Sequence, residues 1–359
     1  MKKKILTILG TRPELIKMFP IINKLDKKFN NKLIWSGQHY DYSMVKQNFN
    51  DIKLRDPDIE IKIKKNKNIF FQIQEKLYDI ILNQKPDAII YHGDTYTTLA
   101  ASLVSNYFFY HIKKIHIEGG YRSGDKNQIE ERARTTSDQL SNIIFVTREQ
   151  EKKNLLKENI KNNVYVVGNS INDSIKYILK RNKNKSLTTN QYTLENKKFI
   201  YVTIHRSENV DNKKRLFKII KIINTLATNY KIIFPIHPRT AKKFKKLSVK
   251  LKSNIILIPP INYSDSIFLI SKCFFCFSDS GGLQEEAIIL KKRCLVPSDK
   301  TPHAHYLDKN ANHLVNINKI SFLSFVNKFA ISVDKNKSKK FFHKKNTSQL
   351  ITKIIKKIV

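Results

Sequence analysis

The chain alternates short runs of β-forming residues with longer stretches of helical period along most of its 359 residues. Strands joined by crossover helices pair in parallel, so this order predicts an open parallel sheet with helices on its faces. The strands predicted in the first half are Lys4–Leu9, Lys32–Trp35, Asp87–Tyr91, Lys114–Ile117, Asn142–Val146 and Val164–Val167.

A second series of the same kind follows the polar segment Arg181–Asn190, which has no periodicity and is interpreted as a linker. We therefore predict an α/β protein with two Rossmann-like domains, at residues 1–182 and 183–345, whose parallel sheets face a central cleft. Residues 346–359 are predicted to form a C-terminal helix, with the N-terminal domain as one candidate packing partner. The strands predicted in the second series are Phe199–Thr203, Lys231–Pro235, Asn254–Ile258, Cys273–Phe277 and Arg293–Val296.

Glycine is scarce in this chain, and every glycine follows a predicted strand. Glycine lets the backbone turn sharply or approach a ligand closely, so this distribution favours a ligand site at the carboxyl edges of the sheets. Neither a Gly-x-Gly-x-x-Gly fingerprint after the first strand nor a P-loop motif occurs, which disfavours dinucleotide binding and P-loop NTPase activity. The nine glycines are Gly10, Gly37, Gly93, Gly119, Gly120, Gly124, Gly168, Gly281 and Gly282.

The net charge of +37 suggests nucleic acid as one class of partner. The lysines, however, are spread along the whole chain and are not clustered with aromatic residues on one element. We attribute the charge to a lysine-rich proteome, predict no nucleic-acid partner, and expect the charge to help anionic substrates arrive.

No stretch approaches the roughly 20 apolar residues that cross a bilayer. The N-terminal Met-Lys-Lys-Lys leads directly into a strand without a signal core. We therefore expect a cytoplasmic protein that does not bind a membrane. Cys273, Cys276 and Cys294 are interpreted as core residues and not as a metal or redox site.

Charged residues follow the predicted strands of the first domain. Arg12 and Lys17 flank the start of a helix, where a phosphate could bind. Asp94 and Glu118 each follow a strand and would bring two carboxylates to the cleft, although Asp94 could instead cap a helix. Glu130 and Glu131 open a further helix that carries Arg134, and the helix dipole alone could account for one of these glutamates.

The second domain has basic and glycine-rich strand ends. His205 and Arg206 follow its first strand and His237 follows its second, which suggests diphosphate binding. The segment Ser280–Gly281–Gly282 opens a helix whose main-chain N–H groups could bind a phosphate. One turn further on, Glu286, together with Glu285, could accept hydrogen bonds from the hydroxyls of a ribose.

Taken in order, these motifs resemble the non-hydrolysing UDP-N-acetylglucosamine 2-epimerase family, which has a GT-B-like fold. The resemblance runs from Gly10 to about Val315 and rests on these segments: Gly10–Glu14 with Lys17, His92–Thr95, His116–Glu118, Glu130–Glu131 with Arg134, His205–Arg206 and Asp279–Glu286. It implies acid/base roles for Asp94, Glu118 and Glu130, with His205 and Arg12 near the diphosphate and Glu286 on the ribose. It also implies a UDP-sugar substrate, no metal or redox cofactor, and a role in surface polysaccharide precursor synthesis. We further expect a homodimer.

The chemistry expected of such a family suits these residue types. The proton at C2, beside an acetamido group, is barely acidic, so inversion is expected to proceed through elimination of UDP and its re-addition. Carboxylates near the reacting carbon and cations on the leaving diphosphate are what this reaction requires. A hydrolysing epimerase that releases ManNAc and UDP, a GT-B glycosyltransferase and a non-catalytic UDP-sugar sensor stay open as alternatives.

Three segments depart from the family pattern. The family usually has Glu-Ala-Gly-Leu-Arg where this chain has Glu-Gly-Gly-Tyr-Arg at residues 118–122. The segment Asp299–His305 lacks an arginine expected near the sugar or phosphate, so the sugar could be GlcNAc or a related one. The segment Gln38–Asp41 matches only in part the region with which bacterial members bind an activating second UDP-sugar.

Overall fold

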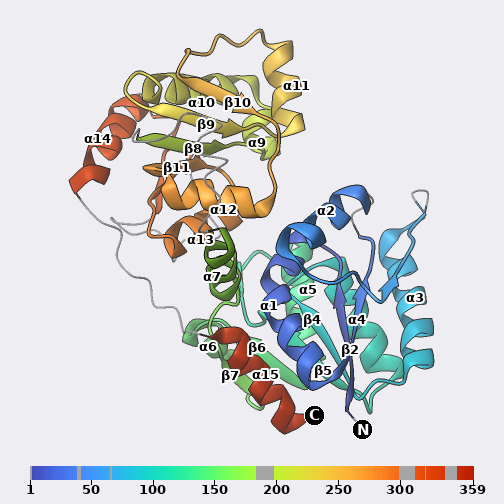
Figure 1. Ribbon diagram of the computed structural model, residues 1–359. Coiled ribbons are helices and arrows are strands. Elements are labelled where there is room, and N and C mark those ends of the chain that lie inside the picture. Colours follow the sequence, from blue (N-terminus) through green and yellow to red (C-terminus); the bar gives the residue numbers. More distant parts are fainter. Residues whose placement is uncertain are drawn as a thin grey trace. The chain divides into compact units, whose positions relative to one another are not determined.

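A computed structural model describes residues 2–38, 42–64, 67–182, 198–298, 312–319, 321–335 and 346–359. The chain divides into two compact units (Figure 1). Unit 1 comprises Met1–Tyr177 and His343–Val359, and unit 2 comprises Ile178–Phe342. Residues 183–190 of the predicted linker lie outside the described residues.

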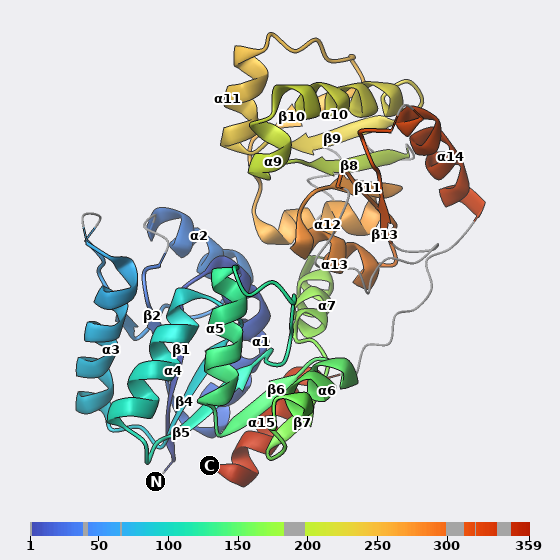
Figure 2. The ribbon, with the colours of Figure 1, turned by 180° about the vertical axis from the view of Figure 1, so that it is seen from behind.

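Unit 1 contains a parallel sheet of seven strands in the order β3-β2-β1-β4-β5-β6-β7. Helices cover both faces of this sheet, with α1 in front in Figure 1 and α4 and α5 in front in Figure 2. The strands are β1 (Lys4–Leu9), β2 (Asn30–Trp35), β3 (Ile59–Glu60), β4 (Ala88–His92), β5 (Lys113–Ile117), β6 (Ile143–Val146) and β7 (Val164–Val166). The helices are α1 (Arg12–Lys28), α2 (Tyr42–Ile52), α3 (Ile69–Gln84), α4 (Tyr96–Phe108), α5 (Ile129–Gln139), α6 (Glu149–Lys157) and α7 (Ile171–Arg181), which continues into unit 2, with α15 (Thr347–Ile358) from the C-terminus.

Unit 2 contains a parallel sheet of six strands in the order β10-β9-β8-β11-β12-β13. Its strands are β8 (Phe199–Thr203), β9 (Lys231–Pro235), β10 (Ile255–Ile258), β11 (Phe275–Ser278), β12 (Cys294–Val296) and β13 (Asn312–Leu314). Its helices are α9 (Ser207–Val210), α10 (Lys213–Leu226), α11 (Pro238–Lys246), α12 (Tyr263–Lys272), α13 (Gly281–Ile289) and α14 (Phe322–Lys335). The predicted α/β class with two parallel sheets is confirmed.

One edge strand in each sheet was not predicted from the sequence. Strand β3 has two residues and β13 has three. Such short strands contain too few residues for a pattern of period two, and each is held by pairing with one neighbour only, β2 or β12. Their positions therefore depend on pairing with the neighbouring strand of the sheet.

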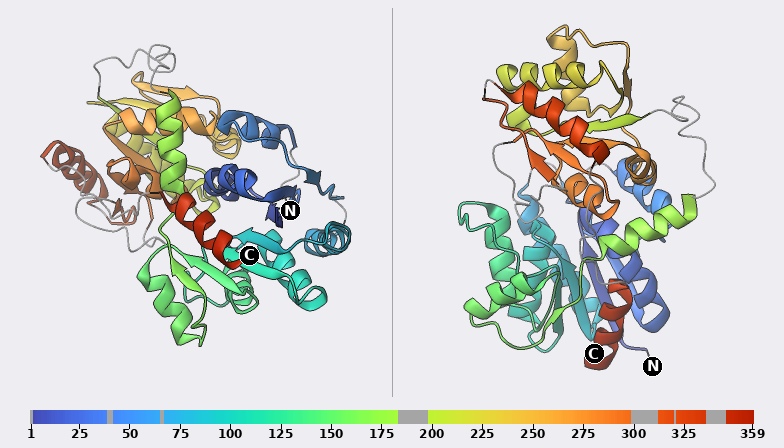
Figure 3. Two further views of the ribbon diagram at one scale, coloured as in Figure 1. Left: turned by 60° about the horizontal axis from the view of Figure 1, so that its bottom comes forward. Right: turned by 90° about the vertical axis from the view of Figure 1, so that its left-hand side faces the viewer.

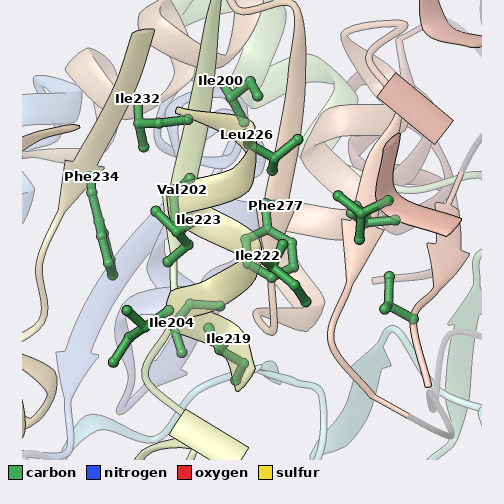
Figure 4. Close-up of a cluster of buried hydrophobic side chains, with 14 of the residues drawn as sticks. Ile200, Val202, Ile204, Ile219, Ile222, Ile223, Leu226, Ile232, Phe234 and Phe277 are labelled. Atoms are coloured by element: carbon green, nitrogen blue, oxygen red, sulfur yellow. The ribbon is translucent and has the colours of Figure 1, made fainter. Parts of the chain in front are cut away.

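The core of each unit forms where apolar strand faces meet apolar helix stripes. In unit 2, Val202 of β8 and Phe277 of β11 lie against Ile219 and Ile223 of α10, and all four side chains are buried (Figure 4). Burying side chains of this size contributes about 1.5–3 kcal/mol each to stability relative to exposure.

The C-terminal helix α15 belongs to unit 1. It is the dark red helix marked C in Figure 3 and packs against α1. Its N-terminus is fixed by Asp173 of α7, whose Oδ2 accepts hydrogen bonds from the main-chain N–H of Ser348 at 2.7 Å and from its hydroxyl at 2.6 Å. Ile351 and Ile355 point into the core.

Candidate active site

In unit 1, the sheet order brings the ends of three neighbouring strands together. Strand β1 pairs with β4, and β4 pairs with β5. The strand order reverses between β1 and β4, and ligands of open α/β sheets bind at such switch points. The residues that end or follow these strands, Gly10, His92–Asp94 and Glu118, therefore lie at one edge.

The junction of β1 and α1 is packed against the start of α4. A Cβ atom on Gly10 would lie 2.1 Å from Thr97 Oγ1 and 2.4 Å from Ser36 Oγ, so only glycine fits there. The buried carboxylate of Glu14 accepts hydrogen bonds from Gly10 N at 2.7 Å and from Thr95 Oγ1 at 2.6 Å. Burial raises the pKa of Glu14, although these hydrogen bonds act in the opposite direction. Glu14 thus joins two of the three loops and has no oxygen left for chemistry.

Glu118 lies at the end of β5 beside a cation from α1. Lys17 Nζ donates to both carboxylate oxygens of Glu118, at 2.6 and 2.8 Å. His92 Nε2 lies 3.4 Å from Glu118 Oε2. Burial alone would raise the pKa of Glu118, but Lys17 and His92 outweigh it and lower that pKa well below its usual range. The Glu118 side chain stays 27% exposed, so an ionised carboxylate is within reach of a ligand.

Asp94 is held by an arginine from α5. The guanidinium of Arg134 donates to Asp94 Oδ2 through Nη2 and to Glu131 Oε2 through Nη1, the latter at 3.0 Å. The same guanidinium lies over the ring of Tyr121, 4.7 Å from its centroid. Stacking of this kind contributes about 0.5–2 kcal/mol and fixes the plane of the guanidinium. Tyr121, where the family usually has leucine, therefore helps to orient the partner of Asp94.

The two adjacent glutamates of α5 have opposite environments. Glu131 is buried, and its carboxylate accepts hydrogen bonds from Ser123 N at 2.8 Å and Gly124 N at 3.1 Å. Burial would raise the pKa of Glu131, but these main-chain donors lower it. Glu130 is exposed in the first turn of the helix. Of the two, Glu130 is the carboxylate that a substrate could reach.

The buried pair His116 and Asp138 contacts the loops that carry the candidate carboxylates. His116 Nδ1 lies 2.8 Å from Asp138 Oδ1, and its Nε2 lies 2.8 Å from the carbonyl oxygen of Gly93. Asp138 also accepts hydrogen bonds from Gly120 N and Arg122 Nη1. Burial would raise the pKa of Asp138, but the positive charges of His116 and Arg122 lower it. This network connects the loops after β4 and β5, which carry Asp94 and Glu118.

The other two candidates of unit 1, Lys17 and Arg12, have different surroundings. Lys17 contacts Glu118, whereas the sequence analysis assigned it to the substrate. Arg12 is exposed at the first position of α1 and makes no hydrogen bond or ion pair within the described residues. Its guanidinium is therefore available to an anion at this helix N-terminus.

In unit 2, one buried carboxylate organises the strand ends. Asp279, directly after β11, accepts hydrogen bonds from His205 N at 3.1 Å, Arg206 N at 3.0 Å and Asn209 Nδ2 at 3.0 Å. In addition, the side-chain Nδ1 of His205 lies 3.3 Å from Asp279 Oδ1. Asp279 is 1% exposed, so it holds the loop after β8 and does not face a ligand.

Histidine and glycine residues line the remaining part of this edge. The rings of His205 and His237 lie 5.9 Å apart, and His237 Nδ1 accepts a hydrogen bond from Arg239 N. Burial, with the neighbouring His205 and Arg239, lowers the pKa of His237. Strands β9, β8 and β11 are neighbours, so His237, His205 and the start of α13 lie along one edge.

The start of α13 has the features of an anion site. Ser280 caps the helix, with Oγ accepting a hydrogen bond from Leu283 N at 3.4 Å. Gly281 and Gly282 are its first two residues, and a Cβ on Gly282 would meet nothing within 4 Å. The main-chain N–H groups there are open to an anion. Glu286 is half-buried one turn further on, and Glu285 is buried.

Glu14, His92, Glu131 and Asp279 were not predicted from the sequence as individual functional residues. All four are buried and connect the candidates to the scaffold. They could have been found from the sequence, because each lies within one of the motifs quoted for the family. The family usually carries alanine at position 119, where a Cβ on Gly119 would lie 2.4 Å from Asp138 Oδ1. Glycine is therefore required at this position in this chain.

Other expectations concern segments that are only partly described. Gln38 Oε1 accepts hydrogen bonds from Thr97 N and Thr97 Oγ1, whereas residues 39–41 and 299–305 lie outside the described residues. Among the described residues, no group of three or more His, Cys, Asp or Glu side chains could hold a metal ion. No helix in the described part of the chain is long and apolar enough to cross a membrane.

Comparison with known proteins gives matches over nearly the whole chain. The profile of a family described as UDP-N-acetylglucosamine 2-epimerase matches residues 23–356. A UDP-N-acetylglucosamine 2-epimerase from Methanocaldococcus jannaschii is 37% identical over 340 residues, which cover 90% of this chain and 91% of the relative. A UDP-2,3-diacetamido-2,3-dideoxy-D-glucuronate 2-epimerase from Pseudomonas aeruginosa is 30% identical, covering 87% of this chain and 88% of the relative.

The fold also matches solved structures. The crystal structure of the Methanocaldococcus jannaschii UDP-GlcNAc 2-epimerase in complex with UDP-GlcNAc and UDP superimposes with a TM-score of 0.84. The alignment covers 99% of each chain at 33% sequence identity.

Proposed function

The chain belongs to the UDP-N-acetylglucosamine 2-epimerase family, and on that premise we propose that it inverts C2 of a UDP-linked N-acetylhexosamine. The substrate pair is UDP-GlcNAc and UDP-ManNAc or a close relative, and the product serves as a precursor of surface polysaccharide. The observation that carries the proposal is the group of carboxylates at neighbouring strand ends, with Glu118 on Lys17 and Asp94 on Arg134.

The reaction divides into an elimination and an addition. A carboxylate takes the C2 proton, the electron pair of the C–H bond forms the C1–C2 double bond, and the bond from C1 to the UDP oxygen breaks. UDP leaves as an anion and the sugar becomes a glycal. UDP then re-adds to C1 while a proton reaches C2 on the opposite face. An acid/base group is therefore needed near each of the two faces of the sugar at C2. Asp94, Glu118 and Glu130 fill these roles.

Lys17 gives Glu118 two states with different basicity. In the free enzyme the ammonium keeps Glu118 ionised and ready to accept a proton. A carboxylate with a low pKa is a weak base, however. Transfer of Lys17 from Glu118 to a substrate phosphate would raise the pKa of Glu118 and make it a stronger base.

Unit 2 supplies the nucleotide site in this proposal. Gly281 and Gly282 at the start of α13 donate main-chain N–H groups to phosphate, and Ser280 donates its hydroxyl. His205, Arg206 and His237 add polar and cationic groups. Glu286 accepts hydrogen bonds from the ribose hydroxyls. Arg12 and Arg134 contribute positive charge from unit 1, which helps the diphosphate to leave.

Two further properties belong to the proposal. The three cysteines of the chain are free and buried, and we propose a cytoplasmic location. We also propose that the protein is a homodimer.

Incubation with UDP-GlcNAc in deuterated water tests the function. We expect deuterium at C2 of a UDP-linked product, seen by NMR and mass spectrometry, since the C2 proton exchanges with solvent through the base. Free ManNAc with UDP would instead identify a hydrolysing enzyme. If UDP-GlcNAc shows no exchange, a UDP-linked diacetamido sugar is the next substrate, and no exchange with either sugar would refute the proposal.

A further inference from the structure

One buried side chain of the candidate active site takes no part in the reaction as proposed so far. His92 is the last residue of β4, and its side chain is 4% exposed. Within the described residues, neither ring nitrogen of His92 has a hydrogen-bond partner. A buried polar group without a partner is costly, and native proteins rarely keep one. We therefore expect the imidazole to have a partner in another state of the protein.

The carboxylate of Glu118 lies close to this imidazole but is held by another residue. His92 Nε2 lies 3.4 Å from Glu118 Oε2, just beyond the about 2.7–3.2 Å of an N–H···O hydrogen bond. Lys17 Nζ donates to both oxygens of the same carboxylate, at 2.6 and 2.8 Å. While Lys17 is in place, the carboxylate is thus drawn to the ammonium, and His92 stays without its hydrogen bond.

A second carboxylate near His92, that of Glu14 on α1, is already occupied. Positive charge on His92 acts to lower the pKa of Glu14 and that of Glu118, so both carboxylates are close to the imidazole. Oε2 of Glu14, however, accepts a hydrogen bond from Gly10 N, and Oε1 accepts one from Thr95 Oγ1. Of the two carboxylates, Glu118 is therefore the one that His92 can bind after a change of partners.

We propose that His92 is a positioning residue, which binds Glu118 in place of Lys17 when Lys17 moves to a substrate phosphate. The inference rests on the proposed function, in which Lys17 makes that transfer. Once the ammonium has left, a small rotation of the carboxylate brings Oε2 within hydrogen-bond distance of His92, in the tautomer that carries its proton on Nε2. Oxygen Oε1 is then left to accept the C2 proton.

This change of partners meets two opposing requirements on Glu118. An ammonium on both oxygens keeps the carboxylate ionised but makes it a weak base. A single N–H donor on Oε2 lets the pKa of Glu118 rise and still fixes the orientation of the carboxylate. In the proton transfer, the C2–H bond breaks and an O–H bond forms at Oε1. His92 gains and loses no proton in this step.

Two substitutions of His92 test whether a donor at the position of Nε2 is what matters. The amide nitrogen of glutamine matches Nε2 of histidine, whereas that of asparagine reaches only the position of Nδ1. We expect His92→Asn to lower kcat for the UDP-sugar by about 10–100-fold, with KM and UDP affinity within a few-fold of wild type. His92→Gln is expected to retain most of the rate. His111→Asn, which removes an exposed imidazole from the same unit, is the control.

The pH profile of kcat separates this role from a contribution of His92 to packing alone. Lys17 and His92 are the cationic groups that act on Glu118, and Glu14 is the other carboxylate beside His92. With Lys17 on the phosphate, loss of the His92 donor raises the pKa of Glu118 in the enzyme–substrate complex. We expect the acid limb of the profile to move up by about 1 pH unit in His92→Asn and by less in His92→Gln. An unchanged limb in His92→Asn, or an equal loss of rate in both variants, would overturn the proposal.

A crystal structure of the wild-type protein with UDP tests the change of partners without any substitution. We expect Lys17 Nζ on a phosphate oxygen and His92 Nε2 within about 3.2 Å of Glu118 Oε2. Lys17 still on both oxygens of Glu118, with His92 as distant as before, would overturn the inference. This measurement does not depend on turnover, so a lack of deuterium exchange in the wild-type protein would refute the proposed function separately.

Discussion

Glu118 is held in a backbone conformation that non-glycine residues avoid, with φ at +68°. Such a conformation costs of order 1–3 kcal/mol and is kept where the surrounding structure determines it. Here the N–H groups of Glu118 and Gly119 both donate to the carbonyl oxygen of Phe145, at 2.9 and 3.1 Å. The strained turn directs the carboxylate to Lys17. The scaffold thus fixes the position of the proposed base before any ligand arrives.

The lowered pKa of Glu118 predicts how stability changes with pH in Lys17→Met. In the wild-type protein this carboxylate contributes stability above its unfolded pKa, near 4.3, and loses it as pH falls through the lower folded pKa. The variant leaves the carboxylate without its ammonium, which costs most when Glu118 is ionised. We therefore expect Lys17→Met to lower the thermal midpoint at pH 7, with a deficit that shrinks below about pH 4.

Thermal unfolding of both proteins between pH 3 and 8 checks this expectation. Lys24→Met, on the same helix, is the control for removal of a positive charge. A deficit for Lys17→Met that is constant across this range would show that packing of the Lys17 side chain, and not its charge, stabilises the pair.

The residue types of the candidate site could be predicted from the sequence, but their contacts could not. Asp94 and Glu118 follow strands, and parallel pairing brings such ends together. Lys17 was predicted to bind phosphate because a helix N-terminus favours anions, yet the side chain reaches across to Glu118. Nothing local distinguishes Glu130 from Glu131. Only the path of the loop after β5 decides that Glu131 caps Ser123 and Gly124.

At the scale of elements, the regular strands were predictable and the edges were not. The central strands β1, β4, β8 and β11 are apolar runs that are buried along their length, apart from their first or last residues. Strands β3 and β13 depend on a neighbour for pairing. The glycines after the strands were informative for a physical reason, since Gly37, Gly93, Gly120, Gly124 and Gly168 have positive φ.

Helix α15 is predicted to stabilise unit 1 by packing against it. Ile355 is fully buried in a helix that joins the unit from the far end of the chain. Removing most of this side chain leaves a cavity against α1, so Ile355→Ala should lower the free energy of unfolding of this unit by about 2–4 kcal/mol. Lys356→Ala changes an exposed neighbour and should have almost no effect. Denaturant unfolding followed by circular dichroism distinguishes the two, and equal effects would mean that α15 does not contribute packing.

At the scale of the whole molecule, the two units present different kinds of functional groups. The described residues of unit 1 present carboxylates with cationic partners, whereas unit 2 presents a glycine-rich helix start with two histidines. A sequence of motifs can predict this division because each motif lies within one unit. Residues 299–305, where the chain departs from the family pattern, lie outside the described residues, and the relatives include epimerases named for two different sugars.

The most direct test compares wild-type protein with Glu118→Gln in deuterated water. The substitution keeps the size of the side chain and removes its ability to accept the C2 proton. We expect exchange at C2 of the UDP-sugar to fall by about 10²–10⁴-fold, while calorimetry shows UDP binding within a few-fold of wild type. Exchange at the wild-type rate would contradict the role of Glu118, and loss of UDP binding together with exchange would contradict the division of tasks between the two units.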